Sequence, residues 1–307
     1  MTRPLKVGIQ MPEVERDVGW PEIRAMAEAA EAVGFDSLWV GDHLLYRLPD
    51  GTPRGPWEAW SQLAALAAVT TRIELGPLVA ATSFHNPAMI AKKAATIDEI
   101  SDGRLILGLG AGWHETEYRA FGFPFDHRVS RFEEAYTIIR TLLREGEIDF
   151  DGRFYQVRDC VLAPRGPRPN GLPLMVGSIG ERMLSITAPH VDLWNAWYDW
   201  FGNQPEGLVP LNASVDAAAR DAGRDPGEIG RTAAVFVQLP SGRGRHRMTA
   251  NPPKADPITG GPDDIAEGLA AFARVGISHL QVVVDPITVE AVEELGPALQ
   301  RLDASSV

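Results

Sequence analysis

The 307-residue chain is long enough for one large domain or two ordinary ones, and 45% of its residues are hydrophobic. Its formal net charge of −12 disfavours nucleic-acid binding, which needs a basic face for the phosphates. No apolar run reaches the roughly 18 residues of a membrane span, the first residues contain no signal-peptide core, and Cys160 is the only cysteine. We therefore expect a cytoplasmic protein without a membrane segment, an intrachain disulfide or a cysteine zinc site.

In the first half of the chain, short apolar segments alternate with stretches whose apolar residues recur at helical spacing. The clearest helix start is Asn86, an N-cap residue, followed by Pro87 at the first helical position, where a missing N–H costs nothing. The predicted elements are strand 5–11, helix 20–34, strand 37–42, helix 58–69, strand 73–80, helix 86–101, strand 104–110 and helix 131–146.

The same alternation continues in the second half after an interruption at residues 147–172, which contain a predicted hairpin around an Asp-Gly turn (FDGRFYQV, 150–157). Residues 240–261 have turn composition and are interpreted as a mobile loop with a basic run at Arg243, Arg245, His246 and Arg247. The predicted elements are strand 173–177, helix 180–188, strand 191–195, helix 210–222, strand 232–239, helix 262–275, strand 279–285 and helix 288–302.

Strands that are each followed by a helix predict an α/β fold with a parallel sheet covered on both faces. Eight such units in about 300 residues fit a (β/α)8 TIM barrel, here with insertions after strand 4 and strand 7. The segments VGFDSLWV (33–40) and VGISHLQV (275–282) share a helix-ending glycine and a strand entry, which indicates one unit used twice. We expect residues 1–307 to form a single barrel domain.

Three glycines at alternate positions, Gly108, Gly110 and Gly112, end the fourth predicted strand and precede Trp113. A dinucleotide fingerprint needs a further glycine where Trp113 stands, and it belongs to the first strand–helix turn of a Rossmann fold. In a barrel, strand ends at the carboxyl face build the active site, so these glycines would let a flat ring lie on the backbone. The alternative is that they relieve crowding inside the barrel.

Asp42 and His43 stand at the end of the second predicted strand. Histidine is the usual general acid or base near neutral pH, and a nearby carboxylate fixes its tautomer. The alternative is a packed histidine with an ordinary hydrogen bond. The run HETE (114–117) lacks the second histidine of H-E-x-x-H, because Tyr118 stands there, so we expect no metal site.

The segment VGSIGERM (176–183) leaves the fifth predicted strand at Gly177 and enters a helix at Gly180. Backbone N–H groups at such a turn form a cradle for an anion. The alternative is an ordinary strand–helix turn.

Taken together, these segments resemble the bacterial luciferase-like, flavin-dependent oxidoreductases, and among them the branch that uses the deazaflavin coenzyme F420. The resemblance covers most of residues 5–200 in the family order and is weaker over 200–307. It is carried by GFDSLWVGDHL, NPAMIAKKAATIDEISDGRLILGLGAGWHETEYRAFG, SRFEEAYTIIRTLL, FDGRFY, LPLMVGSIGERML and VDLWNAW.

The resemblance implies a flavin ring at the carboxyl mouth of the barrel, with His43 next to its reactive edge and Asp42 beside it. It also implies a non-proline cis peptide at Pro77–Leu78, behind the ring, and a homodimer. The residues that it implies for cofactor binding are Leu78, Ala80, Gly110, Gly112 and Trp113 at the ring, Gly177, Ser178, Ile179 and Gly180 at the phosphate, and Trp194 and Asn195 nearby.

One departure limits the activity that the resemblance implies. Sugar-phosphate dehydrogenases of the deazaflavin branch carry a catalytic glutamate directly after the glycine of strand 4, where this chain has Trp113. We therefore expect a different substrate, with His43 as the proton donor or acceptor and with Glu115 and Tyr118 as helpers.

Three functions remain open at the level of sequence. The favoured one is hydride transfer between F420 and a small organic substrate. The alternatives are a monooxygenase that uses reduced FMN and oxygen, and a flavin-binding protein without turnover. The tryptophans expected near the mouth predict an apolar or aromatic substrate; they are Trp57, Trp60, Trp113, Trp197 and Trp200.

Overall fold

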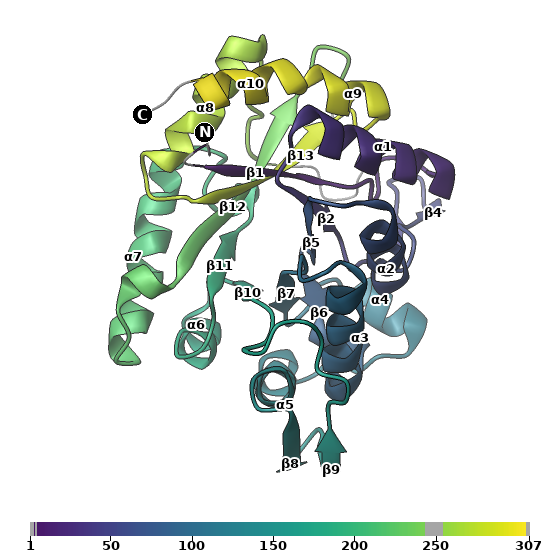
Figure 1. Cartoon of the computed structure of the whole chain (residues 1–307), viewed down its shortest axis with the longest axis vertical. Helices are drawn as coiled ribbons and strands as arrows, with labels where there is room; N and C mark the ends of the chain where they lie inside the picture. Colours follow the sequence, from purple (N-terminus) through teal and green to yellow (C-terminus); the bar gives the residue numbers. More distant parts are fainter. Residues whose placement is uncertain (1–2, 4, 243–253, 305–307) are drawn as a thin grey trace.

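The strands form one parallel sheet that curls into a barrel (Figure 1). The computed structural model describes residue 3, residues 5–242 and residues 254–304. In pairing order the strands are β5 (Glu74–Pro77), β2 (Ser37–Val40), β1 (Lys6–Gln10), β13 (His279–Asp285), β12 (Gly230–Gln238), β11 (Leu193–Ala196), β10 (Leu174–Gly177), β7 (Leu107–Gly110) and β6 (Ala80–Ala81).

β5 and β6 together act as the third strand of the barrel. β5 pairs with β2 and β6 pairs with β7, and a parallel bridge between Leu75 and Leu105 closes the ring on the β5 side. The eight predicted barrel strands are all present in the predicted order, which confirms the (β/α)8 fold class.

The interruption between β5 and β6 contains a cis peptide at Leu78–Val79. The predicted position, Pro77–Leu78, was wrong by one residue. Pro77 still pairs with Val40, and the Leu78 N–H donates to the Val40 carbonyl at 2.8 Å, so the regular ladder continues one residue farther than expected.

Helices surround the strands, with α1, α9 and α10 along one side and α3 and α5 along the opposite side (Figure 1). The predicted cap of α3 is confirmed, because the Asn86 side chain accepts the Met89 N–H and Pro87 begins the helix. The helices are α1 (Trp20–Val33), α2 (Ala59–Val69), α3 (Pro87–Ile100), α4 (Glu115–Phe121), α5 (Arg128–Arg144), α6 (Glu181–Thr187), α7 (Pro205–Asp221), α8 (Pro262–Ala273), α9 (Val289–Glu294) and α10 (Gly296–Ala304), with short 3-10 turns at Thr82–Phe84, Tyr198–Trp200 and Pro226–Glu228.

Several boundaries differ from the prediction. α7 begins at Pro205 rather than at residue 210, because the proline that opens the helix is Pro205 and Pro210 lies inside it. The final helix is interrupted at Leu295 and forms α9 and α10. α4 was not predicted at all, since a helix of seven residues shows little periodicity.

Two hairpins leave the barrel. The predicted one, β8 (Glu147–Asp151) and β9 (Gln156–Val161), extends beyond α5 (Figure 1). A second, β3 (Tyr46–Arg47) with β4 (Pro53–Arg54), follows β2 and was not predicted. The basic run at Arg243, Arg245, His246 and Arg247 lies outside the described residues.

The barrel interior is packed around Trp39, whose side chain is fully buried. A Cβ at Gly8 would lie 2.6 Å from the indole Nε1, and a Cβ at Gly76 would lie 2.5 Å from its Cζ3. The indole N–H donates to Ser37, which bonds His279 at 2.7 Å. Burial and the charge of Lys6 lower the pKa of His279 to about 3, so this interior histidine is neutral. None of the described helices is long and apolar enough to cross a membrane.

Candidate active site

The ends of β2, β6, β7 and β10 meet at the carboxyl face of the barrel, the face on which barrel enzymes carry their active sites. His43 follows β2, Trp113 and His114 follow β7, and residues 178–180 follow β10. Residues far apart in the chain therefore share one mouth.

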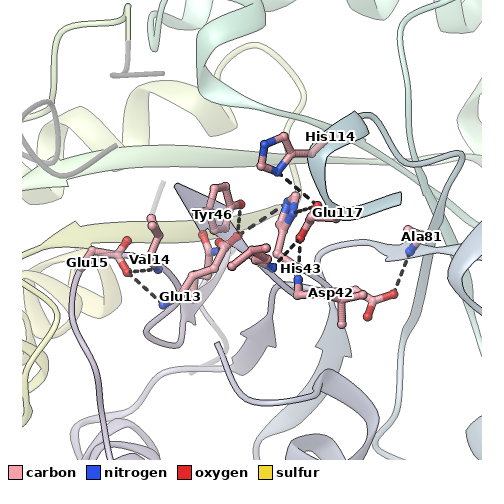
Figure 2. A network of polar contacts seen from close by, with 12 residues as sticks. Glu13, Val14, Glu15, Asp42, His43, Tyr46, Ala81, His114 and Glu117 are labelled. Atoms are coloured by element: carbon pink, nitrogen blue, oxygen red, sulfur yellow. Dashed lines mark hydrogen bonds and ion pairs between the residues drawn. The ribbon is translucent and has the colours of Figure 1, made fainter. Parts of the chain in front are cut away.

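His43 is held by a carboxylate that the sequence did not indicate. Its Nδ1 lies 2.9 Å from Oε2 of Glu117, on α4, and its Nε2 lies 3.6 Å from Oε1 of Glu13, after β1 (Figure 2). The His43 side chain is 20% exposed, whereas the side chains of Glu117 and Glu13 are 0% and 5% exposed. The ring thus faces the mouth while its two acidic partners are buried.

Glu117 is fixed by the backbone as well as by His43. Its Oε1 accepts the N–H groups of Leu44 and Leu45, so only Oε2 faces the histidines. Glu117 is the last residue of the HETE run, three positions after His114. Its contact with His43 joins residues that are 74 positions apart in the chain. Glu115, which we expected to help, is exposed at the first position of α4.

The two carboxylates set the charge of His43. Burial acts to lower the pKa of His43, but the carboxylates of Glu13 and Glu117 outweigh burial, so this pKa is raised above its ordinary value. Burial acts to raise the pKa of Glu117, whereas the two histidines and the Leu44 N–H lower that pKa to about 2. An imidazolium beside a carboxylate is therefore the favoured state of the pair.

Glu13 has its own supports. The Tyr46 hydroxyl donates to its Oε1 at 2.5 Å, and the Gln10 amide donates to its Oε2 at 2.6 Å. The Tyr46 ring also contacts His43, with centroids 4.8 Å apart. These contacts hold the buried carboxylate on the Nε2 side of the histidine.

Asp42 does not contact His43 through its carboxylate, contrary to the pairing we expected from their adjacency. Its Oδ2 accepts the Ala81 N–H at 2.9 Å and lies 3.3 Å from Nε2 of His85 (Figure 2). Both residues lie beyond β2, which ends at Val40, and the Asp42 carboxylate is directed to β6 rather than to His43. Asp42 instead fastens β6 to the end of β2.

Tyr118 holds the turn after β7. Its side chain is fully buried, and its hydroxyl donates to the Ala111 carbonyl and bonds Ser83, both at 3.0 Å. A Cβ at Gly112, whose φ is +74°, would lie 1.9 Å from this hydroxyl. Tyr118 therefore supports the mouth.

The glycines of β7 have packing reasons of their own. A Cβ at Gly108 would lie 2.2 Å from the Pro77 carbonyl oxygen, and a Cβ at Gly110 would lie 2.8 Å from Cγ2 of Val79. Close packing inside the barrel is therefore enough to explain why these two positions are glycines, without a ligand. Leu78 and Ala80 are themselves buried beside them.

Apolar side chains remain exposed at the mouth. Trp113 is 54% exposed, stacks on His114 with centroids 5.0 Å apart, and meets the edge of His43 at 5.6 Å. Ile179 is 45% exposed in the turn after β10. Exposed apolar groups of this size beside a charged histidine are typical of a binding site.

The turn after β10 presents bare backbone. A Cβ at Gly180 would meet no atom within 4 Å, and one at Gly177 would meet only ordinary contacts with Val79 at 3.5 Å. Trp194 is buried and donates its indole N–H to the Ser178 carbonyl at 2.7 Å, which supports the turn from below.

Asn195 lies inside the barrel rather than on the surface of the mouth. It is buried, and its amide donates to Thr232 at 2.8 Å and to Gln281 at 2.6 Å. The structure therefore places Trp194 and Asn195 beneath the turn, where they shape it.

The tryptophans divide into two groups. Trp60 is buried with its indole N–H on His85, and Trp197 packs against the core. Trp57 is 64% exposed and lines a cleft of about 450 Å³ with Val18 and Glu13. Of the five tryptophans that we expected near the mouth, Trp57, Trp113 and the 39%-exposed Trp200 have exposed side chains.

A family model described as luciferase-like monooxygenase matches residues 7–243. The chain belongs to the luciferase-like monooxygenase family. Its relatives are oxidoreductases and monooxygenases, so the protein is an oxidoreductase enzyme.

Two curated relatives show the range of the family. The 5,10-methylenetetrahydromethanopterin reductase of Archaeoglobus fulgidus is 29% identical over 265 residues, which cover 86% of this chain and 73% of that protein. The pyrimidine monooxygenase RutA of Cronobacter sakazakii is 35% identical over 175 residues, which cover 55% of this chain and 50% of RutA. The matched part of this chain thus spans about half the length of RutA.

Solved structures confirm the barrel. An F420-dependent secondary alcohol dehydrogenase in complex with an F420-acetone adduct superposes with a TM-score of 0.81 over 97% of this chain and 99% of that chain, at 18% sequence identity. At this identity the similarity shows the fold of a luciferase-like TIM barrel.

Proposed function

We propose that the protein transfers a hydride between coenzyme F420 and a small organic substrate, with His43 as the proton donor. The observation that carries the proposal is the place of the His43 ring at the mouth, between the buried carboxylates of Glu13 and Glu117, which raise its pKa. The F420-dependent alcohol dehydrogenase and a coenzyme F420-dependent tetrahydromethanopterin reductase with the same fold support the choice of cofactor.

The residues at the mouth fit a flat, phosphate-bearing cofactor. Trp113 and Ile179 offer exposed apolar faces for the ring. The turn from Gly177 to Gly180 offers backbone N–H groups for a phosphate. Neither glycine has a side chain to cover them, and the space around Gly180 is open. Leu78, Ala80, Gly110 and Gly112 would form the floor beneath the ring.

The cofactor, when bound, supplies the hydride chemistry. This chain's residues supply orientation and the proton. Reduction of a carbonyl leaves negative charge on its oxygen, and a charged imidazole beside that oxygen neutralises it. Nε2 of His43 is the nitrogen available for this transfer, since Nδ1 is engaged by Glu117 at 2.9 Å and the nearest carboxylate oxygen to Nε2 is 3.6 Å away.

An apolar or aromatic substrate fits the exposed side chains near His43. Trp57 and the cleft beside Glu13 have a size typical of small-molecule sites, and the Arg16 guanidinium at the cleft is already paired with Glu22. A substrate with an apolar body is therefore favoured over an anionic one. The homodimer, the cytoplasmic location and the single-domain organisation stay predictions from the sequence.

The second candidate is a monooxygenase that uses reduced FMN and oxygen. It is favoured by the 35% identity with the pyrimidine monooxygenase over 175 residues and by the family model, described as luciferase-like monooxygenase, that matches residues 7–243. The same apolar wall and the same bare turn would hold FMN, so the cofactor must be decided by measurement.

We expect the apoprotein to bind F420 more tightly than FMN. Equilibrium titrations followed by fluorescence would give both dissociation constants under the same conditions. A lower dissociation constant for FMN, or FMN retained through purification, would contradict the deazaflavin proposal and favour the monooxygenase.

We also expect Gly180→Val to weaken cofactor binding at least about tenfold, or roughly 1.4 kcal/mol. The valine side chain meets no protein atom, so the fold is retained while the backbone is covered. Gly177→Val should act in the same direction.

Gly227→Ala is the matched control, because Gly227 lies in the loop before β12, at the opposite end of the barrel. A folded Gly180→Val protein with the affinity of Gly227→Ala would show that the turn is only structural.

A further inference from the structure

The mouth contains three metal-ligating side chains that the sequence does not show as a motif. His114 and Glu117 come from the turn after β7 and from α4, and His43 comes from the end of β2 (Figure 2). One possible ligand atom of each lies within 4.8 Å of the others. We expected no metal because the second histidine of H-E-x-x-H is missing from the sequence. In the structure, His43 provides a second histidine from the segment that follows β2.

We propose that His43, His114 and Glu117 form a binding site for a divalent cation of the zinc type. Two imidazole nitrogens and one carboxylate oxygen are a ligand set that zinc sites use, with a fourth position open to water. Bonds of about 2.0–2.1 Å separate tetrahedral ligand atoms by roughly 3.3 Å. Oε2 of Glu117 lies 2.9 Å from Nδ1 of His43 and 3.3 Å from Nδ1 of His114.

The carboxylate is oriented before any cation arrives. Leu44 and Leu45 donate their N–H groups to Oε1 of Glu117, so Oε2 is the oxygen directed at both histidines. Hydrogen bonds of this kind orient metal ligands and strengthen their sites.

The His43 ring is oriented in the same way. Its Nδ1 faces Oε2 of Glu117 at 2.9 Å, while its Nε2 lies 3.6 Å from Oε1 of Glu13, so the ring already presents Nδ1 to the proposed site.

His114 provides the third ligand and the most specific observation. Its Nδ1 is buried and makes no hydrogen bond, although it lies 3.3 Å from Glu117. Its ring is stacked on Tyr46, with centroids 5.3 Å apart, and on Trp113. A buried nitrogen without a hydrogen bond costs free energy, and a cation between the three side chains would satisfy it.

Solvent reaches the site, since the His43 and His114 side chains are 20% and 17% exposed. A cation on Nδ1 of His43 would displace the proton of that nitrogen to solvent. The ring would then be neutral, and Nε2 could release its proton only by forming an imidazolate, so the ring would no longer act as a proton donor. Inhibition by zinc therefore rests on the proposed function, whereas zinc binding does not.

Calorimetric titration of the metal-free, cofactor-free protein with Zn²⁺ tests the site. We expect one Zn²⁺ per chain and no comparable binding of Mg²⁺, which prefers oxygen ligands. His114→Gln should weaken Zn²⁺ binding by at least about 10–100-fold, the usual loss for removing even an indirect partner of a ligand. His127→Gln, at a side chain that is 48% exposed, is the matched control and should bind as the parent does.

Binding that is equally tight in the parent and in His114→Gln would overturn the proposal, as would no binding by the parent. X-ray absorption of the zinc-loaded parent gives a test without mutation: scattering from two imidazoles supports the site, and its absence contradicts it. Zinc that binds there without slowing turnover would leave the site intact and instead contradict the proton-transfer role of His43.

Discussion

His43→Gln is expected to slow turnover by about 10²–10⁴-fold, the usual contribution of a positioned general acid. Glutamine fills much of the space of the imidazole but carries no titratable proton. The hydrogen bonds, ion pairs and ring contacts of His43 with the described residues join it to Glu13, Glu117, Tyr46, Trp113 and His114 and not to the turn after β10, so cofactor affinity should stay within a few fold. Steady-state kinetics with the reduced cofactor and a substrate from an apolar carbonyl panel would measure the loss.

His43→Ala should be at least as slow as His43→Gln, and His85→Gln is a useful comparison because His85 contacts Asp42 and Trp60 but not His43. Turnover by His43→Gln near that of the parent would mean that His43 only shapes the pocket. The proton would then come from water, from Glu115, which is exposed, or from Tyr118, which is buried and bonded to Ser83.

Glu117→Ala is expected to lower the free energy of unfolding by about 3–5 kcal/mol, the cost of removing one partner of a buried ion pair. The change leaves the N–H groups of Leu44 and Leu45 without an acceptor and leaves His43 without its closest counter-charge. Glu117→Gln should cost less, because its amide oxygen still accepts the two backbone N–H groups. Urea unfolding of the three proteins measures both differences.

The Glu117 contribution also depends on pH. Its pKa is lowered on folding, from 4.5 to about 2, so its stabilisation is fully present above pH 4.5 and is lost as the pH falls toward 2. The difference in unfolding free energy between the parent and Glu117→Gln should therefore shrink over this range. A difference that stays constant from neutral pH to pH 2 would contradict the ion pair.

The pH dependence of turnover gives a second readout of Glu117. A proton donor must be charged, and its carboxylate neighbours raise the pKa of His43, so activity should fall only as the pH rises through that raised value. In Glu117→Gln the negative charge is lost, the pKa of His43 falls, and the decline in turnover should begin at a lower pH. An unchanged profile would show that Glu117 does not act through His43.

Most of the fold was predictable because barrel strands and amphipathic helices each leave a periodic signal in sequence. Two local signals were confirmed as well: the N-cap Asn86 followed by Pro87 at the start of α3, and the Asp-Gly pair that indicated the β8–β9 hairpin. The hairpin β3–β4 was missed because strands of two residues have no period. The cis peptide was displaced by one residue because its place depends on how far β5 pairs with β2, which only the register shows.

The candidate site was predictable at the level of strand ends but not of contacts. His43 and Trp113 were found because residues at the carboxyl ends of barrel strands converge. Glu117 was missed because its partner His43 is 74 residues away and because α4, which orients it, is too short to recognise. Asp42 was paired with His43 on adjacency alone, whereas its carboxylate accepts the Ala81 N–H and faces His85, contacts with a segment about 40 residues away that adjacency does not show.

The central claim is hydride transfer, and an isotope experiment tests it most directly. Reduced F420 labelled with deuterium at its transferable position would be incubated with the protein and a panel of apolar carbonyl compounds without oxygen. Our account predicts deuterium on the former carbonyl carbon and a rate that oxygen does not change. Oxidation of a reduced cofactor only when oxygen is present, with oxygen incorporated into the product, would contradict it and would identify a monooxygenase.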